Sequence, residues 1–97
     1  MKVSLIPSDR ADKEWMVSIR RPNKRITLYF GQKNATSYIN HRSIKKRRAW
    51  LAQHKGKDFT ISGVEDPRWW SRWLLWNKFS ISAAKKDITG RFGIEFI

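Results

Sequence analysis

Cysteine is absent from this chain of 97 residues. Its absence excludes disulfide bonds, a thiolate nucleophile and any zinc or iron–sulfur site built on cysteine. Histidine is scarce too, because only His41 and His54 are present, and they stand too far apart on one predicted helix to share a metal ion. We therefore expect no metal site and no cofactor. We expect His54 to bond the last carbonyl groups of its helix.

Long hydrophobic runs are missing as well. No window approaches the roughly 20 apolar residues of a membrane-spanning helix. The apolar stretch within the first ten residues is shorter than the roughly 7–15 residues of a signal peptide. From these patterns we expect a soluble protein without a membrane partner, located in the interior of a cell or packaged in a particle.

Acidic residues are absent from the whole section between Glu14 and Asp58, which nevertheless holds 12 of the 21 Lys and Arg residues. Solvated surfaces usually mix both signs of charge, because like charges side by side repel each other. A section without carboxylates predicts that the counter-charge comes from outside, as a phosphate backbone, an acidic protein face or an anionic membrane surface. Most of the formal net charge of +13 is concentrated here.

Catalytic patterns are also missing, since neither a Ser-His-Asp set nor a Gly-rich phosphate loop is visible. Asp12 and Glu14 are a candidate pair for holding Mg²⁺ in a nuclease. A solvated turn explains two neighbouring carboxylates better. We therefore expect a protein that is not an enzyme.

Large aromatic side chains are what the chain does have. A chain of this length supports one domain, residues 1–97, and folding at this size hides only about two thirds of the surface of the unfolded chain. Six Trp, five Phe and two Tyr residues meet the need for a compact core, since each buried aromatic ring removes about 150–250 Å² from water. We expect these residues to form the core first and a ligand surface second.

Alternation of polar and apolar residues predicts three strands near the N-terminus and a short one at the C-terminus. The second and third strands are joined by a turn in which Pro22 and Asn23 favour a hairpin, and Gly31 ends the sheet. The expected strands are residues 2–6, 15–20 and 25–30, with the last one passing through Phe92, Ile94 and Phe96.

A first helix is expected over at least Arg42–His54, which lacks Gly and Pro and is rich in good helix formers. Ile44 and Leu51 mark its predicted buried side. The basic residues expected to point away from the core are Arg42, Lys45, Lys46 and Arg48.

Two further helices have clear starts. Asp66 caps the first of them and Pro67 is its first residue, and it is expected to run to about Lys78. Ser80 caps a last helix, residues 81–88, which Gly90 ends. The predicted fold class is therefore α+β, a small antiparallel sheet (a β-meander) packed by two or three helices.

The run Lys45-Lys46-Arg47-Arg48 is the sharpest local signal. Basic runs of this kind also occur on solvated helix faces. In a eukaryotic host, the sequence KKRR is also compatible with a nuclear-localisation signal. The acid-free surroundings favour phosphate neutralisation, which brings affinity but little sequence preference. The candidate nucleic-acid-binding residues are Arg20, Arg25, Arg42, Lys45, Lys46 and Arg48.

Aromatic residues near these cations have two interpretations. Tyr29, Tyr38 and Trp50 could stack on unpaired bases, but closing a small core is the simpler role. Asn40 or Gln53 could read adenine in a major groove, although no helix-turn-helix partner places the helix there. The candidate structural or partner-binding residues of the second helix are Trp69, Trp70, Trp73 and Trp76.

Three segments resemble a family of small basic proteins of unknown function from large DNA viruses and some tailed phages. That family combines a short sheet ending in Phe-Gly, a His-rich basic helix ending in Arg-His, and the stretch Phe-Trp-Ser-Arg-Trp-Leu-Leu-Trp-Asn-Lys. Phe30-Gly31 and residues 70–78 match well, within roughly residues 25–80. Gln53 stands where the family has a basic residue and Trp69 where it has Phe or Gly-Phe. The matching segments are His41-Arg42, Arg47-Arg48-Ala49-Trp50-Leu51-Ala52-Gln53-His54 and Trp70-Ser71-Arg72-Trp73-Leu74-Leu75-Trp76-Asn77-Lys78.

The resemblance implies a viral genome and a virion as context, with no established activity to transfer. It makes two hypotheses concrete. The first is a small viral protein that binds DNA or RNA through phosphate contacts in the virion or in the host cytoplasm or nucleus. The second is a minor capsid or virion structural protein that uses the aromatic helix to contact other viral structural proteins. The two hypotheses differ over the helix that begins at Pro67 and carries four tryptophans, here called the Trp helix. The first hypothesis predicts that this helix is buried in the monomer, whereas the second predicts that some of its tryptophans stay exposed until assembly.

Overall fold

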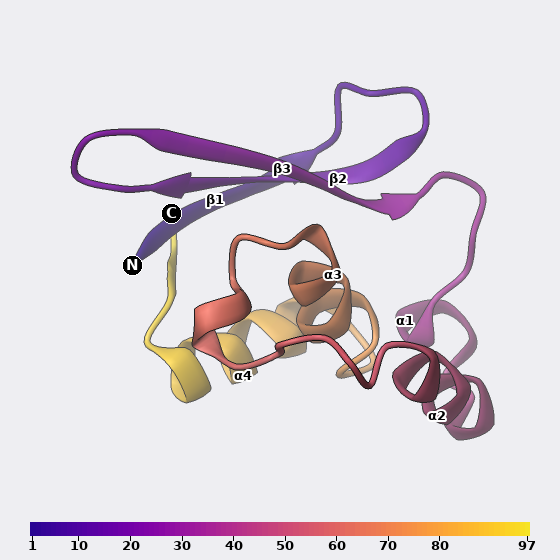
Figure 1. Cartoon of the computed structure of the whole chain (residues 1–97). Helices are drawn as coiled ribbons and strands as arrows, with labels where there is room; N and C mark the ends of the chain where they lie inside the picture. Colours follow the sequence, from indigo (N-terminus) through magenta and orange to yellow (C-terminus); the bar gives the residue numbers. More distant parts are fainter.

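The computed structural model describes residues 1–97, and it has a sheet with helices packed on one of its faces (Figure 1). The sheet has four strands in the order β3-β2-β1-β4. The strands are β1 (Lys2–Pro7), β2 (Lys13–Arg20), β3 (Arg25–Gln32) and β4 (Glu95–Phe96). The helices are α1 (Tyr38–His41), α2 (Ile44–Gln53), α3 (Pro67–Trp70) and α4 (Ile81–Phe92). The predicted α+β class is confirmed.

The predicted meander is present in β1, β2 and β3, which pair antiparallel in sequence order. In the β2–β3 hairpin Val17 stands opposite Leu28 and Ile19 opposite Ile26. These side chains share the face that the helices cover, because alternate residues of a strand point to the same side. The other face of the sheet has no covering helix (Figure 1).

The last strand differs from its prediction. β4 contains only Glu95–Phe96 and pairs parallel with β1, so the sheet is mixed. Phe92, expected in this strand, is the last residue of α4, which runs past Gly90. α4 ends instead at Gly93, whose φ of 68° suits glycine and whose N–H donates to the Thr89 carbonyl.

The first predicted helix is broken. Arg42 has a φ of 55°, a left-handed conformation that ends α1, and α2 begins only after Ser43. The Ser43 side chain accepts from the Lys46 N–H, and the Ser43 N–H donates to His41 Nδ1 at 3.0 Å. Ile44, expected on the buried side, is 54% exposed as the first residue of α2. The residues that face the protein are Arg47, Trp50, Leu51 and His54.

The second predicted helix starts as expected but changes its geometry. Asp66 caps α3 by accepting from the Arg68 N–H, and α3 continues into a π-helical turn, Ser71–Leu75, closed by the Trp76 N–H donating to the Ser71 carbonyl. The wider turn ends the helix at Leu75, three residues short of the predicted Lys78.

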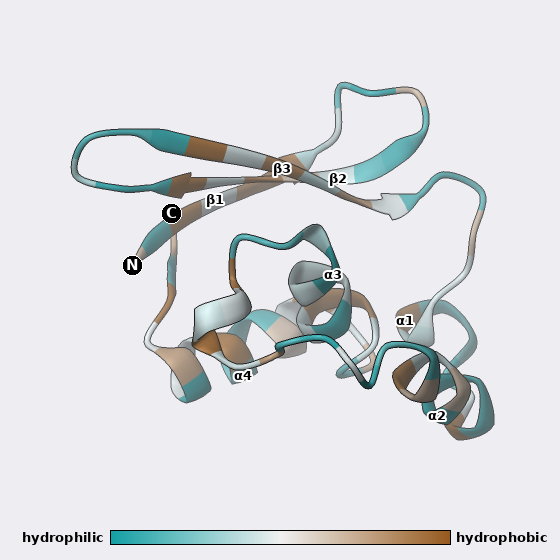
Figure 2. Cartoon of the chain, in the orientation of Figure 1, coloured by the Kyte–Doolittle hydropathy of each residue, from teal (hydrophilic) through white to brown (hydrophobic).

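The core lies between the sheet and α3, the π-helical turn and α4. Val17, Ile19, Trp70, Leu74 and Ile88 are fully buried in it. Figure 2 shows hydrophobic segments in the strands and in the helices beneath them, while the turns are largely hydrophilic. No helix of the structure is both long enough and apolar enough to cross a membrane.

Candidate nucleic-acid interface

The six predicted nucleic-acid-binding residues are all exposed. None of them belongs to an ion pair, because the three ion pairs of the protein join Arg21 to Glu65, Arg68 to Asp66 and Arg91 to Asp87. The structure divides the six between two clusters, and the exposed Lys24 joins the first of them. The hairpin cluster is Arg20, Lys24 and Arg25, and the helix cluster is Arg42, Lys45, Lys46 and Arg48.

The two clusters lie at opposite ends of the molecule. The hairpin cluster surrounds the turn between β2 and β3, and the helix cluster belongs to the end that carries α1 and α2 (Figure 1). The longest extent of the protein is 41 Å. The candidate residues therefore do not form one continuous surface, which the sequence had left open.

Within the hairpin cluster, Arg20 and Arg25 are the last cross-strand pair before the turn. Like charges directly opposite each other destabilise a hairpin. Arg21, in the turn, donates to the Glu65 carboxylate at 2.8 Å and ties the hairpin to the segment before α3. These arginines and Lys24 line an open recess that holds four cations, of which only Arg21 has a carboxylate partner.

The helix cluster surrounds the start of α2. Lys45 and Lys46 stand in the first turn, which contains no acidic residue. The free N–H groups at a helix start carry partial positive charge, so lysines there cost about 0.3–1 kcal/mol. An anion bound from outside offsets that cost. The start of α2 is therefore a local maximum of positive charge with no carboxylate paired to it.

Arg47 does not share the orientation of its neighbours. Its Nε donates to the Trp76 carbonyl at 2.9 Å, and its guanidinium lies over the Tyr38 ring, 5.4 Å from the centroid. Arg72 donates to the same carbonyl at 3.2 Å. Arg47 thus holds α2 against the end of the π-helical turn. The KKRR run contains three outward cations and one structural one.

Arg72 is half-buried beside other guanidinium groups. Burial, and after it repulsion from Arg47 and Arg91, lowers the pKa of Arg72 to about 10, while Asp87 acts in the opposite direction. Arg72 therefore stays charged at neutral pH. Its guanidinium also lies over the Trp73 ring, 4.3 Å from the centroid, where the ring face attracts a cation.

The tryptophans of the second predicted helix are core residues. Trp69 and Trp70 are fully buried and Trp73 is 8% exposed. Each of the three donates its Nε1–H to a backbone carbonyl: Trp69 to Thr60 at 2.7 Å, Trp70 to Val64 at 2.8 Å and Trp73 to Phe59 at 3.0 Å. Trp76 is half-buried. These rings fasten the segment before α3 and leave little aromatic surface for a partner.

Two of the three aromatic residues that the sequence suggested for base stacking, Trp50 and Tyr38, are enclosed by other side chains, and Tyr29 is half-buried. Trp50 lies between His54, 4.0 Å away with 22° between the rings, and Trp76, 5.4 Å away with 13°. Tyr38 is 7% exposed. The Arg10 guanidinium lies over the Tyr29 ring at 4.3 Å, and hydrogen bonding to Asp9 raises the pKa of that tyrosine.

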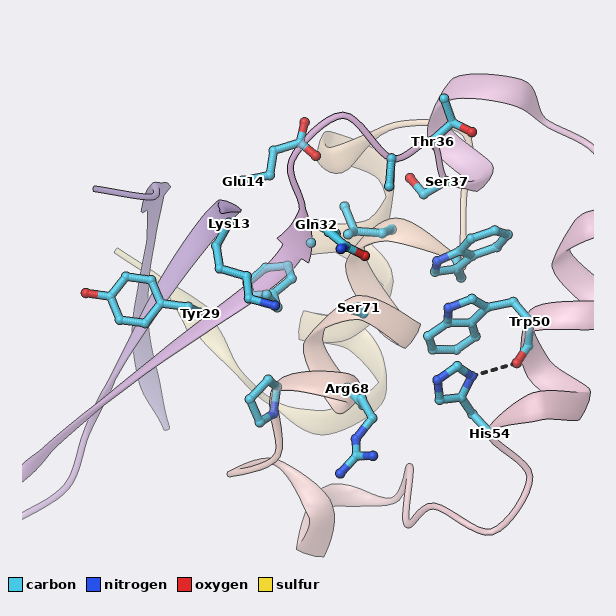
Figure 3. A pocket seen from close by; sticks show the side chains of 16 residues that line it. Lys13, Glu14, Tyr29, Gln32, Thr36, Ser37, Trp50, His54, Arg68 and Ser71 are labelled. Carbon is cyan, nitrogen blue, oxygen red and sulfur yellow. Dashed lines mark hydrogen bonds between the residues drawn. The ribbon is translucent and has the colours of Figure 1, made fainter. Parts of the chain in front are cut away.

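A pocket of about 350 Å³ opens where the end of β3 faces α2 and α3 (Figure 3). As expected, His54 caps its helix: Nδ1 lies 2.8 Å from the Trp50 carbonyl, so Nδ1 carries the proton and donates. In Figure 3 the other ring nitrogen faces the pocket. Lys13, Glu14 and Arg68 complete a wall of mixed charge.

No group of three or more His, Asp or Glu side chains in the protein is arranged to hold a metal ion. Asp12 belongs to the turn before β2, where its carbonyl accepts from the Lys33 N–H, and Glu14 is an exposed residue of β2.

Phe79 is the aromatic residue that the sequence analysis missed. It is 51% exposed and follows Lys78 directly before the cap of α4. The sequence pattern that could have indicated an exposed Phe79 is its position between two helices, after Lys78 and directly before the helix cap Ser80.

Comparison with known proteins gives one result. No curated protein and no solved structure matches the chain. A family model matches residues 3–54, which include β1 except for its first residue, all of β2, β3, α1 and α2, and all six candidate basic residues. The chain belongs to a family of unknown function, DUF5754.

Proposed function

We propose that this protein binds nucleic acid through its phosphate backbone, with little sequence preference. The observation that carries the proposal is that all six candidate cations are exposed and that none has a carboxylate partner. Phosphates supply the missing negative charge, and the counterions that they release drive binding. Because these contacts go to phosphates and not to base edges, they position a strand without reading its sequence.

Burial of the Trp helix favours this function over the structural alternative. A virion protein that docks through Trp69, Trp70 and Trp73 needs them at its surface, yet all three lie in the core. The resemblance to small proteins of large DNA viruses and phages suggests that the bound nucleic acid is a viral genome, in the virion or in the host cell.

The test is binding of fluorescein-labelled single-stranded and double-stranded oligonucleotides, followed by anisotropy from about 50 to 300 mM salt. In the test variant Lys45, Lys46 and Arg48 are replaced by Gln, and Arg47 is kept because it supports the fold. The matched control replaces Lys2, Lys85 and Lys86 by Gln, which removes the same charge from β1 and α4 and leaves both clusters intact.

We expect the test variant to bind at least about tenfold more weakly and its log–log salt slope to be shallower by about 2–3, given roughly 0.7–0.9 per lost phosphate contact. The control variant should keep most of the affinity and slope. Equal losses in both variants would show that only net charge matters, and no binding by the unmodified protein at physiological salt would refute the function.

A further inference from the structure

Phe79 is the only aromatic side chain of the protein that is more than half exposed. Its backbone position is set by the start of α4, where the Ser80 side chain accepts from the Ala83 N–H at 3.1 Å. An apolar ring left in water forgoes the stabilisation of burial. The exposed ring is therefore a feature that the core does not explain.

Cations lie beside this ring. The Arg42 guanidinium lies over it, 5.0 Å from the centroid, and the Tyr38 ring lies 5.2 Å away, tilted by 48°. Tyr38, Arg47, Asn77, Lys78 and Phe79 line a recess of about 310 Å³. No carboxylate lines the recess. The Asp87 carboxylate that holds the Asn77 amide is itself bonded to Arg91.

The recess joins the helix cluster through Arg42. Arg42 ends α1 immediately before α2 and is a member of the helix cluster. Its guanidinium also contacts the Phe79 ring, so it connects the recess to the cations at the start of α2. An exposed ring bordered by such cations has the composition of a site for one nucleotide, in which a base stacks on the ring and its phosphate meets the cations.

We propose that Phe79, Arg42 and Lys78 form a subsite for an unpaired nucleotide, and that the protein prefers single-stranded nucleic acid. The base stacks on Phe79, and its flanking phosphate contacts Lys78 and the Arg42 guanidinium. Bases in a duplex are already stacked on each other, so they offer no free face to this ring. The proposal rests on the proposed function and names the strand form that it selects.

The test compares variants at Phe79 for binding to a 20-nucleotide single strand and to the matching duplex. Phe79→Ala should weaken single-strand binding about 5- to 100-fold, the effect of losing one stacked base, and change duplex binding less than about twofold. Phe79→Tyr should restore the loss and Phe79→Leu should not, because the flat ring is needed. Ile44→Ala is the matched control, since Ile44 is 54% exposed and is not aromatic.

A second variant separates the cation from the fold. Glycine adopts the φ of 55° at position 42 without strain, so Arg42→Gly should keep the melting temperature of the protein while it weakens single-strand binding several-fold. In addition, a strand carrying 4-thiouridine should crosslink under ultraviolet light to the peptide that contains Phe79.

The outcomes distinguish the two proposals. If the unmodified protein binds neither strand form, the proposed function is wrong and the subsite falls with it. If it binds but Phe79→Ala behaves like Ile44→Ala, or loses single-strand and duplex affinity equally, the function stands and the subsite is refuted. Crosslinks confined to other peptides would also refute the subsite.

Discussion

Arg47 and Arg48 show how adjacent residues of one type take different roles. One donates to the Trp76 carbonyl and lies over Tyr38, and the other is exposed without an ion pair. A helix turns by about 100° per residue, so neighbours in sequence point in different directions. Their contributions to stability and to binding should therefore separate.

We expect Arg47→Gln to lower the free energy of unfolding by about 1–2 kcal/mol, because a charged hydrogen bond and a cation–π contact are lost. The cost stays in this range because Arg72 still donates to the same carbonyl. Arg48→Gln should change stability by less than about 0.5 kcal/mol. Urea unfolding of both variants measures the two changes in the free energy of unfolding. A change for Arg47→Gln as small as the one expected for Arg48→Gln would show that Arg47 has no structural role.

Two tryptophans differ in the same way. The Nε1–H of the fully buried Trp70 donates to the Val64 carbonyl at 2.8 Å, whereas the buried Nε1 of Trp15 has no hydrogen-bond partner. Trp70→Phe should cost about 2–4 kcal/mol, because it opens a cavity and leaves a carbonyl without its donor. Trp15→Phe should cost less than about 1 kcal/mol, since its ring is half-buried and its N–H gains nothing in the fold. Thermal unfolding monitored by circular dichroism tests the order, and a reversed order would contradict it.

The start of α3 couples helix capping to pH. Burial raises the pKa of Asp66, but the Arg68 N–H, the Arg68 guanidinium and Lys57 together outweigh burial and lower it. Because the folded pKa is lower than the unfolded one, the ionised carboxylate stabilises the fold above about pH 4. That contribution is lost as the pH falls through the folded pKa.

We therefore expect Asp66→Ala to reduce stability at neutral pH by roughly 0.5–2 kcal/mol, as at other helix caps, and the difference from the unmodified protein to shrink below about pH 4. Asp66→Asn keeps an uncharged cap, so its stability should depend less on pH in this range. Chemical unfolding between pH 2 and 7 measures both. A difference for Asp66→Ala that stays constant with pH would contradict the assignment.

α2 depends on tertiary contacts more than on its own sequence pattern. None of its ten residues is fully buried, and it is attached through Arg47, through Trp50 between two rings, and through Leu51 and His54. A helix fastened by a few side chains can present its other residues to a large ligand. This arrangement leaves the helix cluster outside the packed core.

The hairpin cluster and the helix cluster lie at opposite ends of the whole molecule. If the protein binds nucleic acid as proposed, cations at both ends of a molecule 41 Å long place one contact surface at each end, so that two nucleic-acid segments can be bound at once. Under the proposed function, a protein of this kind would link two strands, and linked strands would condense. The cross-linking depends on both ends, whereas binding to one strand needs only one.

The prediction is tested with one strand fixed to a bead and a second, labelled strand in solution. At low salt the unmodified protein should retain the second strand, and a hairpin variant with Arg20→Gln and Arg25→Gln should retain at least about fivefold less, because each phosphate contact contributes to affinity. The variant of Lys45, Lys46 and Arg48 should show a similar loss. If either variant still links strands as the unmodified protein does, that cluster is not a contact.

Local patterns predicted the parts of the fold that depend on neighbouring residues. The two faces of the β2–β3 hairpin and the caps Asp66, Ser80 and His54 are present as expected. The break at Arg42 was not predictable, because left-handed backbone at an arginine is unfavourable by itself. It is held by the Ser43 N–H bond to His41 and by the packing of α1 on α2.

The sequence by itself determined the fold class, the acid-free basic section and the aromatic core, because composition and periodicity encode which side chains must leave water and which cannot. Only the tertiary structure decided which cations are free. It turned Arg47 inward, divided the basic residues between two ends, enclosed Trp50 between two rings and left Phe79 at the surface. These outcomes depend on contacts between segments far apart in the chain, and no local pattern specifies such contacts.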